Sequence, residues 1–153
     1  MSRVELAAIV LSVAGIAVSI YLTALHYAGA QPACVTTGAV NCEAVLTSSY
    51  AVIAGTSIPT SAAGIVWFGV SAALWTRSAG WLHVGWSALG LLAVLYLVFV
   101  EIVLLGAICL WCTAAHLLVV ALLLLSLSPS GSNQMAQRAK ARRPYRARRG
   151  GSG

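Results

Sequence analysis

Four cysteines, arranged as two pairs, are the residues in this sequence best suited to carry out chemistry. Cys109 and Cys112 are separated by two residues, a spacing that serves both thiol–disulfide exchange and zinc binding. Cys34 and Cys42 lie in a polar segment and are separated by seven residues. A close pair at the start of an apolar helix, combined with a wider pair in one loop, favours a redox relay.

The position of the close pair makes its thiols candidates for reactivity. In a helix, residues three or four apart share a face, so Cys109, Cys112 and His116 would lie on one stripe. The unpaired backbone N–H groups and the dipole at a helix N-terminus stabilise a thiolate and lower its pKa. Two other interpretations stay open: the close pair as inert buried thiols, and Cys34–Cys42 as a purely structural disulfide.

The composition of the chain places these cysteines in a membrane protein. The 153 residues are 60% hydrophobic and 8% charged, and a soluble domain of this size has too small a core to bury so much apolar surface. Four apolar stretches approach the length of about 20 residues that crosses a bilayer. They are Val4–Leu25, Ile58–Trp75, Trp81–Ala107 and Ile108–Leu127. We therefore expect an all-α membrane protein, a bundle of four transmembrane helices.

The two connections at one end of this bundle hold all four cysteines. The third and fourth apolar stretches abut, so a tight turn must separate them, and the Cys109–Cys112 motif then begins the fourth helix. The first two stretches are joined by the outer loop Tyr27–Ser57, in which we expect a short amphipathic helix within Glu43–Ile53. Such a helix would lie at the membrane interface and cap a pocket between the four spans.

The basic residues predict the orientation of the bundle in the cell membrane. All of them fall at the end opposite the cysteines: Arg3, Arg77 and the basic residues between Arg138 and Arg149. By the positive-inside rule that end is cytoplasmic, which places both termini inside and all four cysteines outside, where disulfides persist. A secretory signal ending near residues 28–30 is the competing interpretation, but its apolar run is too long.

The chain is predicted to divide into a membrane domain, residues 1–127, and a basic cytoplasmic tail, residues 128–153. The tail is rich in Ser, Gly, Gln, Ala and Arg and holds little that can pack, so we expect it to be disordered. Its cations favour binding to anionic lipid headgroups. Nucleic acid is not an expected partner, because Tyr145 is the one aromatic residue in the tail.

A set of spaced motifs resembles the vitamin K epoxide reductase family, and in particular its short bacterial members. The set consists of Cys34-x7-Cys42, Ser48 six positions further on, Ile58-Pro59-x4-Gly64, and the C-x-x-C pair on the last helix. The resemblance extends from about Val4 to Leu127, which is the whole membrane portion. Members of that family form a four-helix bundle around a quinone.

The resemblance implies a quinone-dependent thiol oxidoreductase that supports disulfide bond formation. Electrons would pass from a separate thioredoxin-like protein of the DsbA type, outside the cytoplasm, to the loop cysteines, then to the C-x-x-C pair and on to a quinone (menaquinone or ubiquinone). Within this relay, Cys34 would exchange with the partner protein, and Cys42 would bond transiently to Cys109. Cys112 would face the quinone ring.

Four further residues are expected near the quinone. Ser48 would lie in the cap, close to the ring. Thr60 and His116 occupy positions where the animal enzymes have Asn and Tyr, which favours plain quinone reduction over epoxide reduction. Glu101, an acidic residue inside an apolar stretch, would deliver protons to the reduced quinone. Two alternatives stay open: His116 bonding to a neighbouring helix, and Glu101 reaching water at the surface.

Two other functional classes are compatible with four cysteines. A DsbB-type protein also has four spans and two cysteine pairs, but its C-x-x-C pair lies in the first outer loop, opposite to the order here. A non-enzymatic protein that binds zinc through four thiolates needs every sulfur about 2.3 Å from one point. Disulfide exchange is favoured over such a site at an oxidising surface, so no metal is expected.

The charge distribution generates a test of topology. A reporter fused after Leu127 should be cytoplasmic, and a tag inserted near Thr37 should be accessible from outside, because every Lys and Arg falls on one side of a four-span arrangement. Labelling of intact cells with a membrane-impermeant reagent measures both positions. An external reporter after Leu127 would overturn the arrangement.

Overall fold

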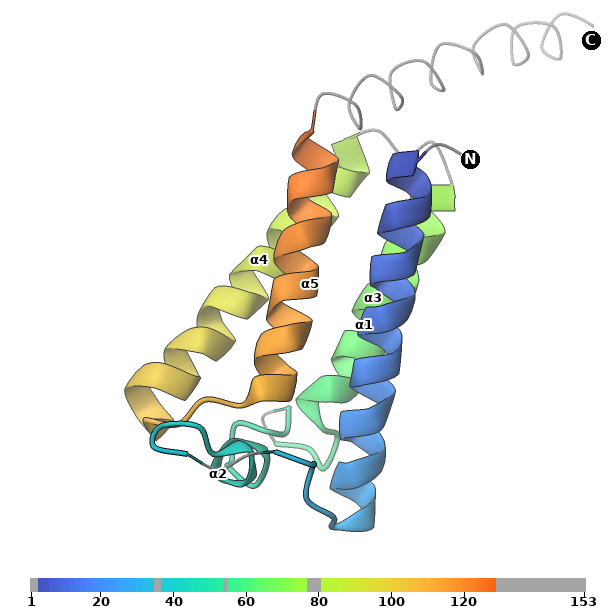
Figure 1. Ribbon diagram of the computed structural model, residues 1–153. Coiled ribbons are helices and arrows are strands. Elements are labelled where there is room, and N and C mark those ends of the chain that lie inside the picture. The colour runs from blue at the N-terminus through green and yellow to red at the C-terminus, as the bar shows by residue number, and fades with distance from the viewer. Residues whose placement is uncertain (1–2, 35–36, 54, 77–80, 129–153) are drawn as a thin grey trace, which may run out of the picture.

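Four long helices run side by side and form the body of the described part of the protein (Figure 1). The computed structural model describes residues 3–34, 37–53, 55–76 and 81–128. Its elements are α1 (Arg3–Ala28), α2 (Cys42–Leu46), α3 (Thr60–Thr76), α4 (Trp81–Phe99), the π-helix η1 (Val100–Leu105) that continues α4, and α5 (Leu110–Leu127). The short helix α2 and the turn before α5 lie at one end of the bundle, which we call the loop end. Arg77 and the predicted tail after Ser128 fall outside the described residues.

The helices confirm the predicted all-α fold. Helix α1, the continuous α4–η1 segment and α5 are each long and apolar enough to cross a membrane by length and composition. Helix α3 has 17 residues and is slightly shorter than the predicted stretch from Ile58. Ile58 and Pro59 are extended and pair with the loop near Val52. Proline favours the position just before or at a helix start, so α3 begins directly after Pro59.

Polar and apolar side chains are distributed in the reverse of a soluble domain. Leu92, Ile102 and Leu117 each expose most of their surface on the outside of the bundle. Several polar side chains lie inside it, among them Ser12, Ser71, Glu101 and His116. Ser12 and Ser71 donate hydrogen bonds to backbone carbonyls of their own helices, so their burial leaves no unpaired hydroxyl. Apolar groups facing outward and satisfied polar groups facing inward suit a lipid surrounding.

Two glycines allow the helices to approach closely. A Cβ atom added at Gly15 of α1 would overlap the ring of Phe68 on α3, and one added at Gly90 of α4 would overlap Trp67 of α3. Phe68 is only 2% exposed, so its ring has no free space into which it can move. Helix α3 is therefore packed against both α1 and α4 through aromatic rings lying on glycine backbone.

A short helix lies where the sequence predicted one, and it covers the first part of the stretch Glu43–Ile53. Helix α2 covers only five residues, and the Asn41 side chain caps its N-terminus. The hydroxyl groups of Thr47 and Ser48 donate to carbonyls of the preceding turn. Such local bonds compete with helix propagation, and the chain continues through turns and bends to residue 51.

The glycine contacts generate a prediction about stability. Gly15→Ala should destabilise the bundle by about 1–3 kcal/mol, because the new methyl group overpacks the buried Phe68 ring. Alanine gains about 1 kcal/mol over glycine in helix propensity, which offsets the loss only in part. Unfolding of the purified protein in mixed detergent and SDS measures the difference.

Gly69→Ala on α3 is the matched control for this substitution. It makes the same chemical change within a helix, but a Cβ atom at Gly69 has no neighbour within 4 Å. Its stability should equal or exceed that of the unchanged protein. Equal stability of Gly15→Ala and Gly69→Ala would show that the close approach of α1 and α3 does not contribute to folding.

Candidate functional site

The outer loop is tied to the turn before α5 by backbone hydrogen bonds. The Ile108 N–H donates to the Ala39 carbonyl (2.8 Å), and the Asn41 N–H donates to the Ile108 carbonyl (3.1 Å). Val40 and Ile108 thus form one parallel bridge between segments far apart in the sequence. The bridge places the residue after Asn41, Cys42, in the same buried cluster as the residue after Ile108, Cys109.

The loop cysteines form a disulfide, and the two cysteines differ in exposure. Cys34 and Cys42 are bonded, with their Cα atoms 6.2 Å apart. Cys42 is 1% exposed and packs in the cluster with Cys109, which is fully buried. Cys34 is only partly buried. An incoming thiol from another protein therefore finds Cys34 the more accessible end of this disulfide.

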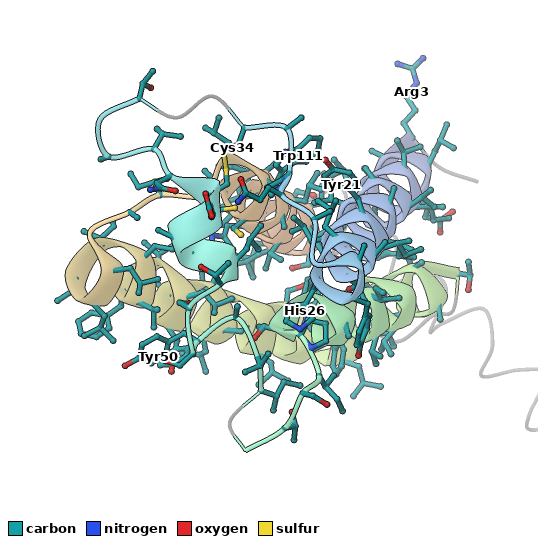
Figure 2. All side chains as sticks on the ribbon, turned by 90° about the horizontal axis from the view of Figure 1, so that it is seen from below. Arg3, Tyr21, His26, Cys34, Tyr50 and Trp111 are labelled. Carbon is teal, nitrogen blue, oxygen red and sulfur yellow. A yellow bond between two sulfur atoms is a disulfide. The ribbon has the colours of Figure 1, made fainter. Side chains whose placement is uncertain are left out.

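An aromatic pair holds the start of the cysteine loop. The Trp111 Nε1–H donates to the Ala33 carbonyl (3.1 Å), and the Ala33 N–H donates to the Tyr21 hydroxyl oxygen (3.4 Å). The two rings contact each other, with centroids 4.8 Å apart. Figure 2, seen from the loop end, shows Trp111 and Tyr21 on one side of Cys34 and α2 on the other. A residue of the C-x-x-C motif itself thus fixes the backbone next to Cys34.

Cys109 is the N-cap of α5 and not a residue of its first turn, which corrects the predicted stripe shared with Cys112 and His116. Its backbone is extended, and its Sγ accepts a hydrogen bond from the Cys112 backbone N–H (3.3 Å). Because an N-cap residue lies outside the helical spiral, its side chain packs with α2 while Cys112 and His116 line an internal cavity. The two thiols of the motif thus contact each other, and each has a further neighbour: α2 for Cys109 and the cavity for Cys112.

The Cys109 thiol is stabilised as a thiolate. The Cys112 thiol donates a hydrogen bond to it, and together with backbone N–H groups of the first turn this holds the pKa of Cys109 below that of an ordinary thiol. Burial and the nearby Glu101 carboxyl act in the opposite direction without reversing the shift. A lowered pKa means that the thiolate persists as the pH falls through the range in which a free cysteine becomes protonated.

A cavity of about 600 Å³ lies between the four long helices at the loop end. The segment after α2 covers it, and most of its lining side chains are apolar. Five predicted site residues line it together: Cys112, Ser48, Thr60, Glu101 and His116. The other three, Cys34, Cys42 and Cys109, belong to the neighbouring cluster that packs α2 against the turn before α5. The structure thus brings all eight residues into two adjoining places, and their individual roles stay predictions.

The two hydroxyl groups of the cavity are engaged with the backbone. Ser48 Oγ donates to the Val45 carbonyl (2.7 Å), and Thr60 Oγ1 donates to the Tyr50 carbonyl (3.2 Å). The Thr60 N–H also donates to the Ala51 carbonyl (2.8 Å), which fastens the loop to the start of α3. Either hydroxyl must rotate away from its carbonyl before it can donate to a quinone oxygen.

One family model matches the part of the chain that holds the loop disulfide and the C-x-x-C pair. The model of the vitamin K epoxide reductase family matches residues 6–127, which include both cysteine pairs and every residue that lines the cavity. The chain belongs to the vitamin K epoxide reductase family. No curated protein matches it significantly.

Membership of the vitamin K epoxide reductase family confirms the resemblance and settles the general class. Members are multi-pass membrane proteins with four transmembrane helices, and they are quinone-reducing oxidoreductases. The somewhat short α3 is accordingly the second of the four spans. Thiol oxidoreductase chemistry fits the two cysteine pairs, and a quinone fits the largely apolar cavity.

Several polar residues of the cavity were missed by the sequence interpretation, among them Ser19, Ser61, His26 and Tyr50. His26, near the end of α1, and Tyr50, in the loop, both line it, and Figure 2 shows them on the face seen from the loop end. His26 had a signal in the sequence, because Ser19, Leu22 and His26 are spaced as one helical face and all three line the cavity. Tyr50 had none, because its position depends on turns that follow α2.

Proposed function

We propose that this protein passes electrons from a thioredoxin-like protein outside the cytoplasm to a quinone, and so supports disulfide bond formation. The observation that carries the proposal is the placement of the two cysteine pairs. The loop disulfide has a more accessible end, Cys34, and a buried end, Cys42. The C-x-x-C pair has one thiol, Cys109, in the cluster with Cys42 and one, Cys112, in the cavity.

The first half of the relay is disulfide exchange. A thiolate of the partner protein attacks the Cys34 sulfur, and Cys42 leaves as a thiolate. Cys42 then attacks Cys109 of an oxidised Cys109–Cys112 pair, and Cys112 leaves. The partner's second thiol releases Cys34, which attacks Cys42 and reforms the loop disulfide while Cys109 is freed. The net result is an oxidised partner and a reduced C-x-x-C pair, the thiol state found in the structure.

The second half of the relay is quinone reduction. The reduced pair gives up two electrons and becomes a disulfide again, while the quinone takes two electrons and two protons and becomes a quinol. Cys112 is the thiol that reaches the quinone, because it lines the cavity. Ser48, Thr60 and His116 are proposed to contact the ring from the cap, from α3 and from α5.

The cavity suits a substrate that arrives through the lipid. Leu89, Leu92 and Tyr96 of α4 line the cavity, and each exposes more than half of its surface. Helix α4 diverges from α3 toward the loop end (Figure 1), where η1 continues it and α2 lies nearby. A quinone with an apolar tail can therefore reach Cys112 from the bilayer without crossing water, which supports menaquinone or ubiquinone as the acceptor.

The alternative functions have less support. Among the described residues, no three His, Cys, Asp or Glu side chains are grouped so that they could hold a metal ion. A four-thiolate zinc site also needs four free sulfurs, whereas Cys34 and Cys42 are bonded to each other. The DsbB type differs in the order of its cysteine pairs along the chain.

The relay predicts different effects for the two cysteine pairs. Cys109→Ala and Cys112→Ala should each abolish quinone reduction by any thiol donor, because the electrons leave through this pair. Cys34→Ala and Cys42→Ala should block a thioredoxin-like protein donor, while a small dithiol that reduces the C-x-x-C pair directly should still support turnover. The initial rate of quinone absorbance loss with each donor measures these effects.

Ser126→Ala is the control for a conservative substitution of a buried residue. Ser126 lies at the far end of α5 and is 2% exposed, so its removal should leave both donors active. Quinone reduction by Cys112→Ala at the unchanged rate would remove the C-x-x-C pair from the mechanism. Equal loss with both donors in the loop variants would contradict a shuttle function for Cys34 and Cys42.

A further inference from the structure

Quinone reduction at this site requires a path for protons. Oxidation of the C-x-x-C pair releases the proton of Cys112, whose thiol donates a hydrogen bond to the Cys109 thiolate. The quinone needs two protons to become a quinol. Most of the cavity lining is apolar, so a side chain that can bind and release a proton must stand between the thiol and the ring.

Glu101 is a carboxylic acid that contacts both the cysteine motif and the cavity. It is 5% exposed and lines the cavity together with Cys112 and His116. Its carboxyl group accepts a hydrogen bond from the Cys109 backbone N–H, and its charge acts on the Cys109 and Cys112 sulfurs alike. The alternative that Glu101 reaches water at the membrane surface does not match this burial.

The backbone around Glu101 explains how an acidic residue comes to face inward. Residues Val100–Leu105 form a π-helix, an uncommon wide turn that is frequent at functional sites. The Glu101 carbonyl accepts hydrogen bonds from the N–H groups of Gly106 and Ala107, and Gly106 adopts a positive φ of 60° that ends the turn. Ile102, Val103 and Leu104 face outward, whereas Val100 and Glu101 are buried.

We propose that Glu101 is the acid–base residue of the quinone site. Its carboxylate takes the proton from Cys112 as the two thiol sulfurs lose two electrons and bond to each other, and it delivers that proton to a quinone oxygen. The second proton of the quinol comes from water at the loop end and passes through the same carboxyl group. The inference rests on the proposed function and adds to it the residue that moves the protons.

Four other titratable side chains also line the cavity. His116 on α5, His26 on α1, Tyr50 in the loop and Tyr96 on α4 all line it. Only for Glu101 does the structure show a hydrogen bond to the backbone of the cysteine motif, among the residues it describes. A test by pH therefore needs a histidine variant beside the Glu101 variant.

The test is a single turnover of quinone reduction by Glu101→Gln. The protein is reduced, freed of reductant and mixed under anaerobic conditions with a short-chain ubiquinone, whose fully substituted ring cannot be alkylated by thiols. Glutamine keeps the size of the side chain and an oxygen that accepts from Cys109, but it cannot carry a proton. The rate constant should fall by about 100-fold, the usual contribution of a general acid–base group.

The pH profile distinguishes proton transfer from positioning. In the unchanged protein the rate should fall as the pH is lowered and the carboxylate becomes protonated, because a protonated Glu101 cannot accept from Cys112. In Glu101→Gln the profile should lose this contribution and keep only the fall caused by protonation of the Cys109 thiolate, whereas the profile of His26→Gln should match that of the unchanged protein. An unchanged rate in Glu101→Gln, or a slower rate with an unchanged pH profile, would overturn the inference.

Two readouts keep the result interpretable. Quenching of tryptophan fluorescence by the quinone, through Trp67 in the cavity, should show unchanged binding, and non-reducing peptide mapping should show the Cys34–Cys42 bond in Glu101→Gln. Glu5→Gln removes another buried carboxyl group, in the first turn of α1 and far from the loop end, and this variant should react at the unchanged rate. Absence of quinone reduction by the unchanged protein would count against the proposed function itself, whereas loss of binding in Glu101→Gln would assign the residue to the fold of the cavity.

Discussion

The rest of the site depends on one backbone interaction, the pairing of the loop at Ala39–Asn41 with Ile108. Two hydrogen bonds, of 2.8 and 3.1 Å, join segments about seventy residues apart in the chain. The residues that follow in the two paired segments are Cys42 and Cys109, so the pairing brings a disulfide sulfur and a thiol into one buried cluster. In the proposed relay, burial then selects the order of exchange, because Cys34 is the more exposed end of the loop disulfide. Trp111 secures the same loop from its other side through Ala33.

A second constraint comes from the membrane, which requires that polar chemistry be enclosed within the bundle. The reactive groups Cys112, His116 and Glu101 face a cavity, while the outer faces of the same helices carry apolar side chains. Enclosed polar groups and an apolar outer face are combined at the junction of η1 and α5. There the π-helix turns a carboxyl group inward, and the extended N-cap keeps Cys109 Sγ in contact with Cys112 while its side chain packs in the cluster with Cys42. In the proposed relay, Cys109 therefore serves the loop and Cys112 serves the quinone, and the two sulfurs stay close enough to bond to each other.

Hydrophobicity, cysteine spacing and the order of motifs predicted the all-α bundle, its four spans and the residues that gather at the loop end. They predicted less about backbone detail. The hydroxyl groups of Thr47 and Ser48 ended α2 early, and the N-cap conformation of Cys109 broke the expected stripe with Cys112. The pairing with Ile108 is a long-range contact without a local signature, and the π-helix has no distinctive composition. The position of Tyr50 in the cavity follows from the turns after α2 and has no sequence pattern, whereas the spacing of Ser19, Leu22 and His26 was a signal for His26 that the sequence interpretation missed.

The contact between Cys42 and Cys109 is the central claim, and trapping their mixed disulfide tests it most directly. In Cys112→Ala the C-x-x-C disulfide cannot reform, and in Cys34→Ala the loop disulfide cannot reform, so each variant lacks one of the two residues that resolve the bond between Cys42 and Cys109, and this bond should accumulate. Non-reducing peptide mapping by mass spectrometry should find the segment around Cys42 crosslinked to the segment around Cys109 in both variants. Free thiols alone in both variants, or a crosslink between Cys34 and Cys109 in Cys112→Ala, would contradict the proposed order of the relay.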